Sequence, residues 1–376
     1  MTVLERAELE QSPLADLHTI ASELGIEGYR RLRREELIGA IVEGQGGAPA
    51  GSEESAAEAP APRRRSRPRR RARTEEADEA PPAAAEEESE SEPEPEAERR
   101  SGILDVLPNG SGFLRSDELS QGKDDVYVAP AQIRRCELRS GDEVAGPTRG
   151  PRRSERHPSL VHVESVNGAD PEPPAERPRV GDLTPVFPSE RLTAPDGLDS
   201  VPFGKGSRVA IGGPPGAGAS AVLRQIAAVL GAQHGDIELT VVLAGVRPEE
   251  VTDWRRELSA RVVGGSFEAA AERQAEAASM AVERAKRAAE RGGDAVVLID
   301  SLDALPAQAA RRVFGAARNT EEAGSVTVFA TTGLAAEPQR IATTRIVLEA
   351  ALPDAQPKLA EETSGTLRSE LLGASG

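Results

Sequence analysis

A glycine-rich segment lies between an apolar stretch and an apolar helical pattern. It reads Gly213-Pro214-Pro215-Gly216-Ala217-Gly218-Ala219-Ser220 and follows the predicted strand 208–211. In a strand, glycine turn and helix start of this kind, backbone amides hold phosphate groups, so the sequence predicts a nucleotide site over residues 213–220. Compared with the pattern G-x-x-x-x-G-K-[ST], Ala219 replaces the lysine that reaches the β- and γ-phosphates. The predicted site therefore lacks one group that stabilises charge during phosphoryl transfer.

An aspartate directly follows the apolar stretch 295–299. Asp300 is placed like the carboxylate that holds Mg²⁺ in phosphate-binding domains, opposite the hydroxyl of Ser220. An aspartate at the end of a strand is also common as a turn or cap residue. Because the glycine-rich loop lies in the same chain, the metal-ligand interpretation is favoured. Ser220 and Asp300 are expected to hold Mg²⁺ if a nucleotide binds.

Two aromatic residues occur on neighbouring predicted strands. Phe113 lies in Asn109-Gly110-Ser111-Gly112-Phe113-Leu114-Arg115, and Tyr127 lies in Asp124-Asp125-Val126-Tyr127-Val128. Exposed rings can stack on the bases of a single strand, whereas an isolated pair in a β domain is more often part of the core. The polar neighbours favour exposure. From Arg134 to Arg156 there are seven arginines against four acidic residues, which is the charge expected along a phosphate track.

The elements that must position these groups form two patterns. From about residue 177 strand and helix alternate, which predicts a parallel α/β domain over 177–376. Its predicted elements are strand 208–211, helix 220–230, strand 239–244, helix 267–291, strand 295–299 and strand 326–330. Residues 101–170 carry short β-prone runs between Pro, Asn and Gly turns, at 102–107, 112–115, 125–128 and 160–166. About five such strands predict a small barrel of the oligonucleotide-binding type.

The N-terminal part divides into a helical module, 1–43, and a linker, 44–100. Ser12-Pro13 is typical of a helix start, and apolar residues recur at helical spacing after it and again within 30–43. Those residues are Leu14, Leu17, Leu24, Leu32, Leu37, Ile38 and Ile41. The linker has no large apolar side chain and is predicted to be disordered. It holds eight arginines in 63–73 and twelve acidic residues in 75–98, so the arginine block is either an extra RNA-binding arm or part of a solvated spacer.

The overall composition limits the class of protein. The chain has 376 residues, a net charge of −17 and 2% aromatic residues. It has no apolar run of about 18 residues and no basic, apolar leader, so a soluble cytoplasmic protein without a membrane partner is expected. The one cysteine, Cys136, excludes an internal disulfide and a Cys-based metal cluster. The acidic charge does not exclude RNA, because it averages an arginine-rich barrel with acidic segments.

The barrel sequence resembles a known domain. Residues 110–115, 124–128 and Pro130-Ala131-Gln132-Ile133-Arg134-Arg135 are similar to the cold-shock-type primary RNA-binding domain of the bacterial transcription termination factor Rho family. The N-terminal module and the segment 314–325 also resemble that family, which implies a RecA-like P-loop domain. By this resemblance, pyrimidine-rich single-stranded RNA is held by Phe113, Arg115, Asp125, Tyr127, Glu155, Arg156 and His157. Two positions depart from the family, since Ser111 replaces a usual second Phe and His157 replaces a common Tyr.

The resemblance also assigns catalytic positions, and several of them are altered. It implies ATP with Mg²⁺ as cofactor and Arg247 as a retained nucleotide-site residue, whereas Val246 stands where a carboxylate orients the attacking water. Ala350 aligns with the arginine finger, a group worth roughly 10³ to 10⁵ in rate. The two loops that enter the central channel of the family's ring, near 305–311 and after Thr332, are shortened. The chain ends about where the family has a further helical segment.

Three functional interpretations follow. The first is a Rho-family termination factor that forms a hexameric ring and moves along nascent RNA as an RNA-dependent ATPase and helicase, with that activity weak or lost. The second is a catalytically inactive RNA-binding paralogue that modulates an intact Rho; the third is an unrelated P-loop fold with an attached barrel. The RNA polymerase complex or an intact Rho is a further expected partner. The sequence leaves open whether ATP is hydrolysed, because Ala219, Val246 and Ala350 each remove an independent contribution.

Overall fold

The computed structural model describes residues 17, 20–21, 38, 41, 98–115, 119–152, 155–173, 177–350 and 356–373. The chain divides into two compact units, Met1–Glu87 and Glu88–Gly376. In the first unit the described residues are all helical, and Leu17, Ala21, Ile38 and Ile41 are buried. Three of these belong to the predicted apolar stripes. The other members of the stripes, and the predicted linker except for 98–100, lie outside the described residues.

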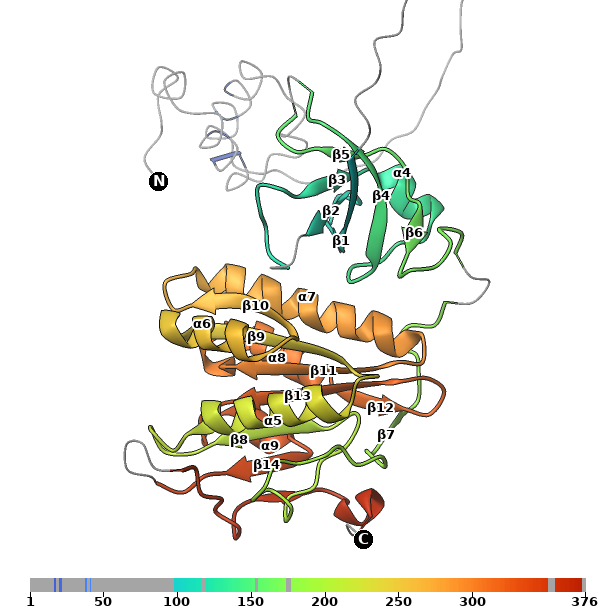
Figure 1. Cartoon of the computed structure of the whole chain (residues 1–376). Coiled ribbons are helices and arrows are strands. Elements are labelled where there is room, and N and C mark those ends of the chain that lie inside the picture. Colours follow the sequence, from blue (N-terminus) through green and yellow to red (C-terminus); the bar gives the residue numbers. More distant parts are fainter. Residues whose placement is uncertain are drawn as a thin grey trace, which may run out of the picture. The chain divides into compact units, whose positions relative to one another are not determined.

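Five short strands close into a barrel in the second unit (Figure 1). The strand order is β1-β2-β3-β5-β4, and β1 also pairs with β4, which closes the barrel, while β6 pairs with β4. The elements are β1 (Glu98–Val106), β2 (Gly112–Arg115), β3 (Val126–Val128), α4 (Pro130–Arg135), β4 (Glu143–Arg149), β5 (Ser159–Leu160) and β6 (Ser165–Val166). Aliphatic side chains fill the interior, among them Leu104, Leu114, Val126, Val128, Val144 and Leu160. The predicted barrel of the oligonucleotide-binding type is confirmed.

The barrel differs from the sequence prediction in three places. β1 begins at Glu98, inside the predicted linker, because Glu98–Ile103 form a backbone ladder with β4 that leaves Glu98 and Arg99 exposed. The predicted strand 160–166 is two short strands, since only 159–160 and 165–166 find partners. None of the four β-prone runs covers β4, whose Gly146-Pro147 is typical of a turn. In the structure Pro147 instead lies opposite Arg99 within the ladder.

A mostly parallel nine-stranded sheet forms the other domain of the second unit. β10, β9, β11, β13, β8 and β14 lie side by side in that order and all run parallel. β15 is antiparallel to β14, and β12 connects β13 to β7. The strands are β7 (Pro185–Val186), β8 (Arg208–Gly212), β9 (Glu238–Val246), β10 (Arg261–Ser266), β11 (Asp294–Asp300), β12 (Arg318–Thr320), β13 (Ser325–Thr331), β14 (Thr344–Val347) and β15 (Gly365–Thr366). The four strands predicted here correspond to β8, β9, β11 and β13, so the predicted parallel α/β class is confirmed.

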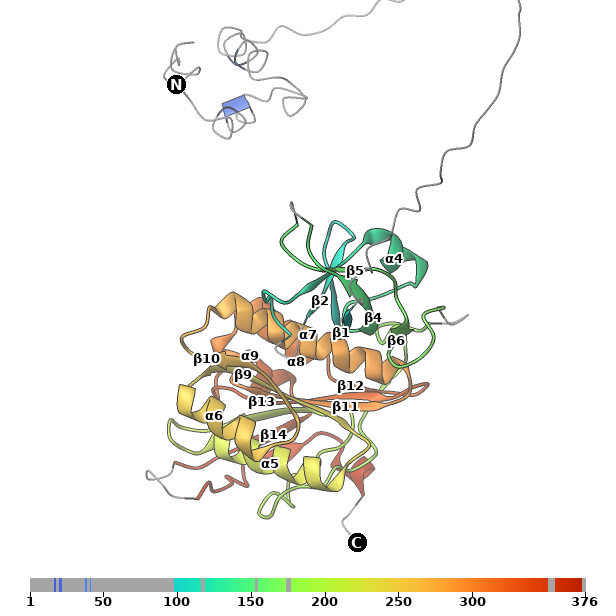
Figure 2. The same cartoon turned by 45° about the horizontal axis from the view of Figure 1, so that its top comes forward.

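Helices cover both faces of this sheet (Figure 2). α5 (Ala219–Gln233) and α6 (Pro248–Glu257) share one buried apolar cluster with the sheet, and α7 (Ala271–Glu290) and α8 (Ala307–Gly315) share another. Successive residues of β11 alternate between the two clusters, because side chains of a strand point to opposite faces. Three shorter elements are α9 (Glu337–Ile341), η2 (Leu302–Ala304) and η3 (Ser369–Leu372). Among the described residues, no helix is long and apolar enough to cross a membrane.

α7 lies between the sheet and the barrel (Figures 1 and 2). Its alanines pack in the same buried cluster as Ile103 and Leu119 of the barrel domain. Gly141, before β4, has a φ of +91°, and a Cβ built on it would lie 2.4 Å from the Glu283 carbonyl. The barrel backbone therefore approaches α7 at a distance that only glycine allows.

Candidate nucleotide and RNA sites

The glycine-rich loop connects β8, an inner strand of the sheet, to the start of α5. Gly216 and Gly218 have φ angles of +84° and +88°, in the left-handed region that favours glycine. Gly218 is also covered by Pro357, because a Cβ built at position 218 would lie 2.6 Å from Pro357 Cγ. α5 begins at Ala219, so its first amides lie directly after the turn. This is the strand, turn and helix start that a phosphate site requires.

Asp300 and Ser220 are brought together at the end of this loop. The Ser220 hydroxyl donates to Asp300 Oδ1 at 3.0 Å, and the Thr331 hydroxyl, at the end of β13, donates to the same oxygen at 2.7 Å. Asp300 is 3% exposed, and its Oδ2 has no hydrogen-bond partner among the described residues. Burial raises the pKa of Asp300, although the two hydroxyl donors partly counter the effect. A buried acceptor without a donor fits a bound cation.

The sequence does not predict Thr331 as a site residue. The signal that could have found it is its position, since it ends the strand next to β11. The described residues contain no group of three or more His, Cys, Asp or Glu side chains that could hold a metal. Ser220 and Asp300 alone supply two oxygens, so phosphate oxygens and water would have to complete an Mg²⁺ shell.

The three altered catalytic positions are apolar in the structure. Ala219 is the first residue of α5, and Ala350 is exposed after β14. Val246 ends β9 and is 6% exposed within the apolar cluster under α5 and α6. Arg247 follows it, but its side chain is 76% exposed and pairs with Glu250 at 3.2 Å. The frame of a nucleotide site is therefore present without a lysine at 219 or a carboxylate at 246.

Aromatic rings from two paired strands meet at the barrel surface. Phe113 of β2 lies opposite Tyr127 of β3, with ring centroids 5.7 Å apart, and the His157 ring lies 5.2 Å from Phe113. These rings line a pocket of about 430 Å³. Its lining is Phe113, Tyr127, Ala129, Arg149, Glu155, Arg156, His157, Ser159, Leu160 and Val161. Ser111, where the family has a further Phe, is 5% exposed and its hydroxyl donates to Asn109 Oδ1, so it closes the β1–β2 turn.

A charged pair is part of the lining of this pocket, which we call the aromatic pocket. Arg149 donates to both carboxylate oxygens of Glu155, at 2.7 and 2.9 Å. These bonds, together with the Arg152 backbone amide, lower the pKa of Glu155 to about 2. Glu155 thus stays ionised and holds Arg149 in place. Arg149 is a lining residue that the sequence prediction does not single out, although it belongs to the arginine-rich stretch.

Arg115 and Asp125, also predicted to face RNA, do not line the aromatic pocket. They are 4% and 1% exposed, and Arg115 Nη1 donates to Asp125 Oδ2 at 2.5 Å. Burial alone would lower the pKa of Arg115, but Asp105 and Asp125 outweigh it and the pKa is raised. Asp125 Oδ1 has no partner among the described residues. The structure therefore divides the predicted RNA-binding residues into five that line the pocket and two that form a buried ion pair, with Arg115 Cζ 5.6 Å from the centroid of the Phe113 ring.

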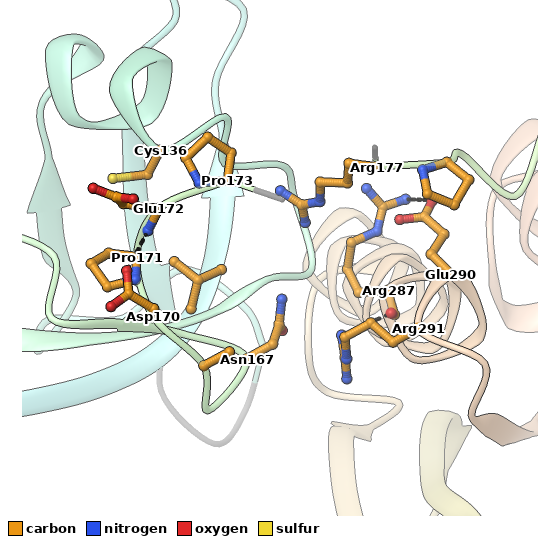
Figure 3. A pocket seen from close by; sticks show the side chains of 13 residues that line it. Cys136, Asn167, Asp170, Pro171, Glu172, Pro173, Arg177, Arg287, Glu290 and Arg291 are labelled. Carbon is orange, nitrogen blue, oxygen red and sulfur yellow. Dashed lines mark hydrogen bonds and ion pairs between the residues drawn. The ribbon is translucent and has the colours of Figure 1, made fainter. Parts of the chain in front are cut away.

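A second cavity, of about 280 Å³, opens between the barrel and the end of α7 (Figure 3). Arg177, Arg287, Glu290 and Arg291 gather on one side of it, while Cys136 lies on the other. Burial raises the pKa of the Cys136 thiol, which keeps it protonated. Arg287 and Glu290 pair with each other at 2.8 Å. No predicted site residue lines this cavity, so we assign it to the contact between the two domains.

The structure thus joins a closed five-stranded barrel of the oligonucleotide-binding type to a parallel α/β domain with a glycine-rich loop between its strand β8 and its helix α5. The profile described as "Rho termination factor, RNA-binding domain" matches residues 100–172, and the profile "Rho termination factor, N-terminal domain" matches residues 8–47. A solved structure described as a prototypical ATPase from the type III secretion system of pathogenic bacteria is 22% identical, with a TM-score of 0.42, and the match covers 53% of this chain and 69% of that chain.

Curated relatives carry the same family description. "Transcription termination factor Rho" of Pseudomonas fluorescens biotype C is 32% identical over 86% of this chain and 75% of the relative. The protein of the same name from Neisseria gonorrhoeae is 38% identical over 61% of this chain and 64% of the relative. The chain belongs to the transcription termination factor Rho family, which confirms the predicted family. The parallel α/β class of its second domain agrees with the RecA-like domain that the resemblance implies.

Proposed function

We propose that this chain binds single-stranded, pyrimidine-rich RNA through the aromatic pocket. The observation that carries the proposal is the meeting of the Phe113, Tyr127 and His157 rings in a pocket of about 430 Å³, with Arg149 and Arg156 on its lining. Stacking on an aromatic ring is worth roughly 1 to 3 kcal/mol per base, and arginines add phosphate contacts. The match to the family's RNA-binding profile supports this assignment.

At the P-loop we propose that ATP binds with Mg²⁺ but is not turned over at a sustained rate. Asp300 Oδ2 is a buried oxygen without a partner among the described residues, and the Ser220 hydroxyl lies beside the same carboxylate. These two groups fit Mg²⁺, which would supply the charge that neutralises the phosphates. Ala219 and Val246 supply neither the ammonium group nor the carboxylate that phosphoryl transfer uses.

In cellular terms, the proposal is a Rho-family protein that acts on nascent RNA, with weak or no ATP-driven movement. A hexameric ring and contact with RNA polymerase belong to the same proposal. The alternative is an inactive paralogue that joins or competes with an intact Rho. Val246 favours this alternative, because a valine has no carboxylate to direct at water. Its side chain is buried among apolar neighbours.

RNA binding is tested by titrating fluorescent oligo(C) RNA with the full chain. We expect Phe113→Ala and Tyr127→Ala each to weaken binding by roughly 5- to 100-fold, the equivalent of one stacked base. Phe187→Ala is the matched control, because Phe187 is 45% exposed on the α/β domain, away from the pocket lining. Unchanged affinity in both barrel variants would overturn the RNA assignment.

Turnover is tested by phosphate release in the presence of ATP, Mg²⁺ and oligo(C). We expect no RNA-stimulated release from the wild-type chain, because Ala219, Val246 and Ala350 stand where the three groups used in transfer would be. Clear release that is abolished by Asp300→Ala would show that the site is catalytically competent. Release that persists in Asp300→Ala would indicate a contaminating ATPase, and the preparation would then be purified further and measured again.

A further inference from the structure

One arginine next to the Phe113 ring is shared between the barrel and the α/β domain. Arg115, in β2, is 4% exposed and contacts three carboxylates from three different parts of the chain. Asp105 of β1 accepts from Nε at 3.2 Å and from Nη2 at 2.5 Å, and Asp125 accepts from Nη1 at 2.5 Å. The third is Glu276 of α7, which accepts from Nη2 at 3.1 Å. Glu276 is thus the only one of these partners that the barrel does not supply.

Glu276 is also the most replaceable of the three partners. Its side chain is 33% exposed, against 18% for Asp105 and 1% for Asp125. Its contact is also longer than the shortest contacts of Asp105 and Asp125, so an exposed competitor would displace it first. Since one guanidinium faces three carboxylates, the loss of Glu276 leaves Arg115 with two. The barrel can therefore keep its own ion pairs when this contact opens.

Arg115 is connected directly to the proposed RNA surface. Its Cζ lies 5.6 Å from the centroid of the Phe113 ring, and Phe113 in turn packs edge to face against Tyr127 and His157. A phosphate or a base placed on Phe113 would come close to the guanidinium. Such a ligand would then compete with Glu276 for the Nη2 hydrogen.

Other contacts hold the rest of α7 to the barrel. Arg284 pairs with Glu143 at 2.9 Å, and Glu290 lies 3.5 Å from Arg139. Both pairs lie C-terminal to Glu276, towards the second half of the helix. In the first turns, Gln274 is buried and donates to the Ser266 carbonyl at 3.0 Å and the Ala269 carbonyl at 2.9 Å. Loss of the Glu276 contact would therefore loosen the first turns of α7 from the barrel only, while Gln274 and the second half of the helix stay in place.

We propose that Glu276 competes with RNA for Arg115, so that RNA binding in the aromatic pocket is coupled to release of Glu276, in the first turns of α7, from the barrel. Glu276 is in this sense a positioning residue that acts through Arg115. The inference rests on the proposed RNA-binding function. Because linkage is reciprocal, whatever weakens the Glu276 contact strengthens RNA binding.

The test compares two variants of α7. Glu276→Ala removes the competing acceptor, and Glu272→Ala removes an equal charge one turn earlier on the same side of the helix, where the residue is exposed. We expect Glu276→Ala to bind oligo(C) RNA roughly three- to tenfold more tightly than wild type. The RNA affinity of Glu272→Ala should differ from that of wild type by less than about twofold, since this variant loses only a distant, screened charge. Glu276→Gln keeps the shape of the side chain, so its affinity for oligo(C) RNA should lie between those of wild type and Glu276→Ala.

Amide hydrogen exchange distinguishes the proposed coupling from a purely structural role of Glu276. Saturating RNA should speed exchange in the first turns of wild-type α7, residues 271–278, and should have no such effect in Glu276→Ala. Equal RNA affinity of the Glu276→Ala and Glu272→Ala variants, or exchange in wild type that RNA leaves unchanged, overturns the inference. If wild type binds RNA and Phe113→Ala weakens it, only the coupling has failed. If wild type does not bind RNA, the proposed function fails with it.

Discussion

The Ser220 hydroxyl and the Asp300 carboxylate lie 3.0 Å apart, although 80 positions separate the two residues in the chain. Ser220 stands in the first turn of α5, and Asp300 is the last residue of β11. Both therefore lie at the carboxyl edge of the parallel sheet, where α/β domains bind their ligands. This contact turns two separate sequence features into one candidate cation site.

Asp300→Asn should remove the effect of Mg²⁺ on nucleotide binding. An amide cannot neutralise the cation, so we expect the affinity for a fluorescent ATP analogue to become the same with and without Mg²⁺. Asp303→Asn is the matched control, because both Asp303 oxygens already accept, from Thr332 at 2.8 Å and from the Gly333 amide at 2.7 Å. If the Asp300 variant kept a Mg²⁺-dependent affinity, the site would not hold the metal.

The buried carboxyl also makes the stability of the metal-free chain depend on pH. Burial raises the pKa of Asp300 above the value of about 3.9 for an unfolded aspartate. The folded chain therefore holds this proton to higher pH than the unfolded chain does. Its contribution to stability is complete below about pH 3.9 and is lost as the pH rises through the raised pKa.

Asp300→Asn removes this titration, so it should flatten the pH dependence and raise the thermal stability of metal-free protein at pH values above the raised pKa. Thermal unfolding between about pH 5 and 8 checks the prediction. Trp254 fluorescence is a suitable signal, because Trp254 is the one tryptophan of the chain and is fully buried. A variant with the same pH slope as wild type would contradict the prediction.

Ala219→Lys should tighten nucleotide binding without restoring hydrolysis. An ammonium group at the start of α5 can reach the phosphates, and we expect roughly tenfold higher affinity for ATP. Hydrolysis should remain absent because Val246 and Ala350 are unchanged. Ala221→Lys is the control, since it adds the same charge at an exposed position of the same helix. Phosphate release by Ala219→Lys alone would mean that positions 246 and 350 are not the missing catalytic positions.

Gly218→Ala should destabilise the P-loop by roughly 1 to 3 kcal/mol, because the residue has a φ of +88° and no room for a Cβ beside Pro357. Pro357→Ala in the same chain removes the overlap but not the backbone strain, so it should recover only part of the loss. Urea unfolding of both single variants and the double variant measures the coupling. Strictly additive losses would show that Pro357 does not cover Gly218.

The frame of both candidate sites could be predicted from local sequence. The glycine spacing of residues 213–218 defines the loop, and alternation places Phe113 and Tyr127 on one face of paired strands, as the register shows. β4 could not be predicted in the same way, because Gly146-Pro147 is typical of a turn and its strand character comes from pairing with β1. Thr331 could not be predicted from the sequence either, since its contact with Asp300 depends on the order of strands in the sheet.

The sequence by itself determined which groups the chain has: glycines where the loop needs them, alanine and valine where transfer chemistry needs charge, and two rings on adjacent strands. The tertiary structure alone decided that Arg115 and Asp125 are buried as an ion pair, and that Glu276 from α7 joins them. The physical reason is that the spacing of apolar residues along a helix or strand determines which face of that element a side chain is on. Which distant segment covers that face, and with what charge, depends on packing between domains.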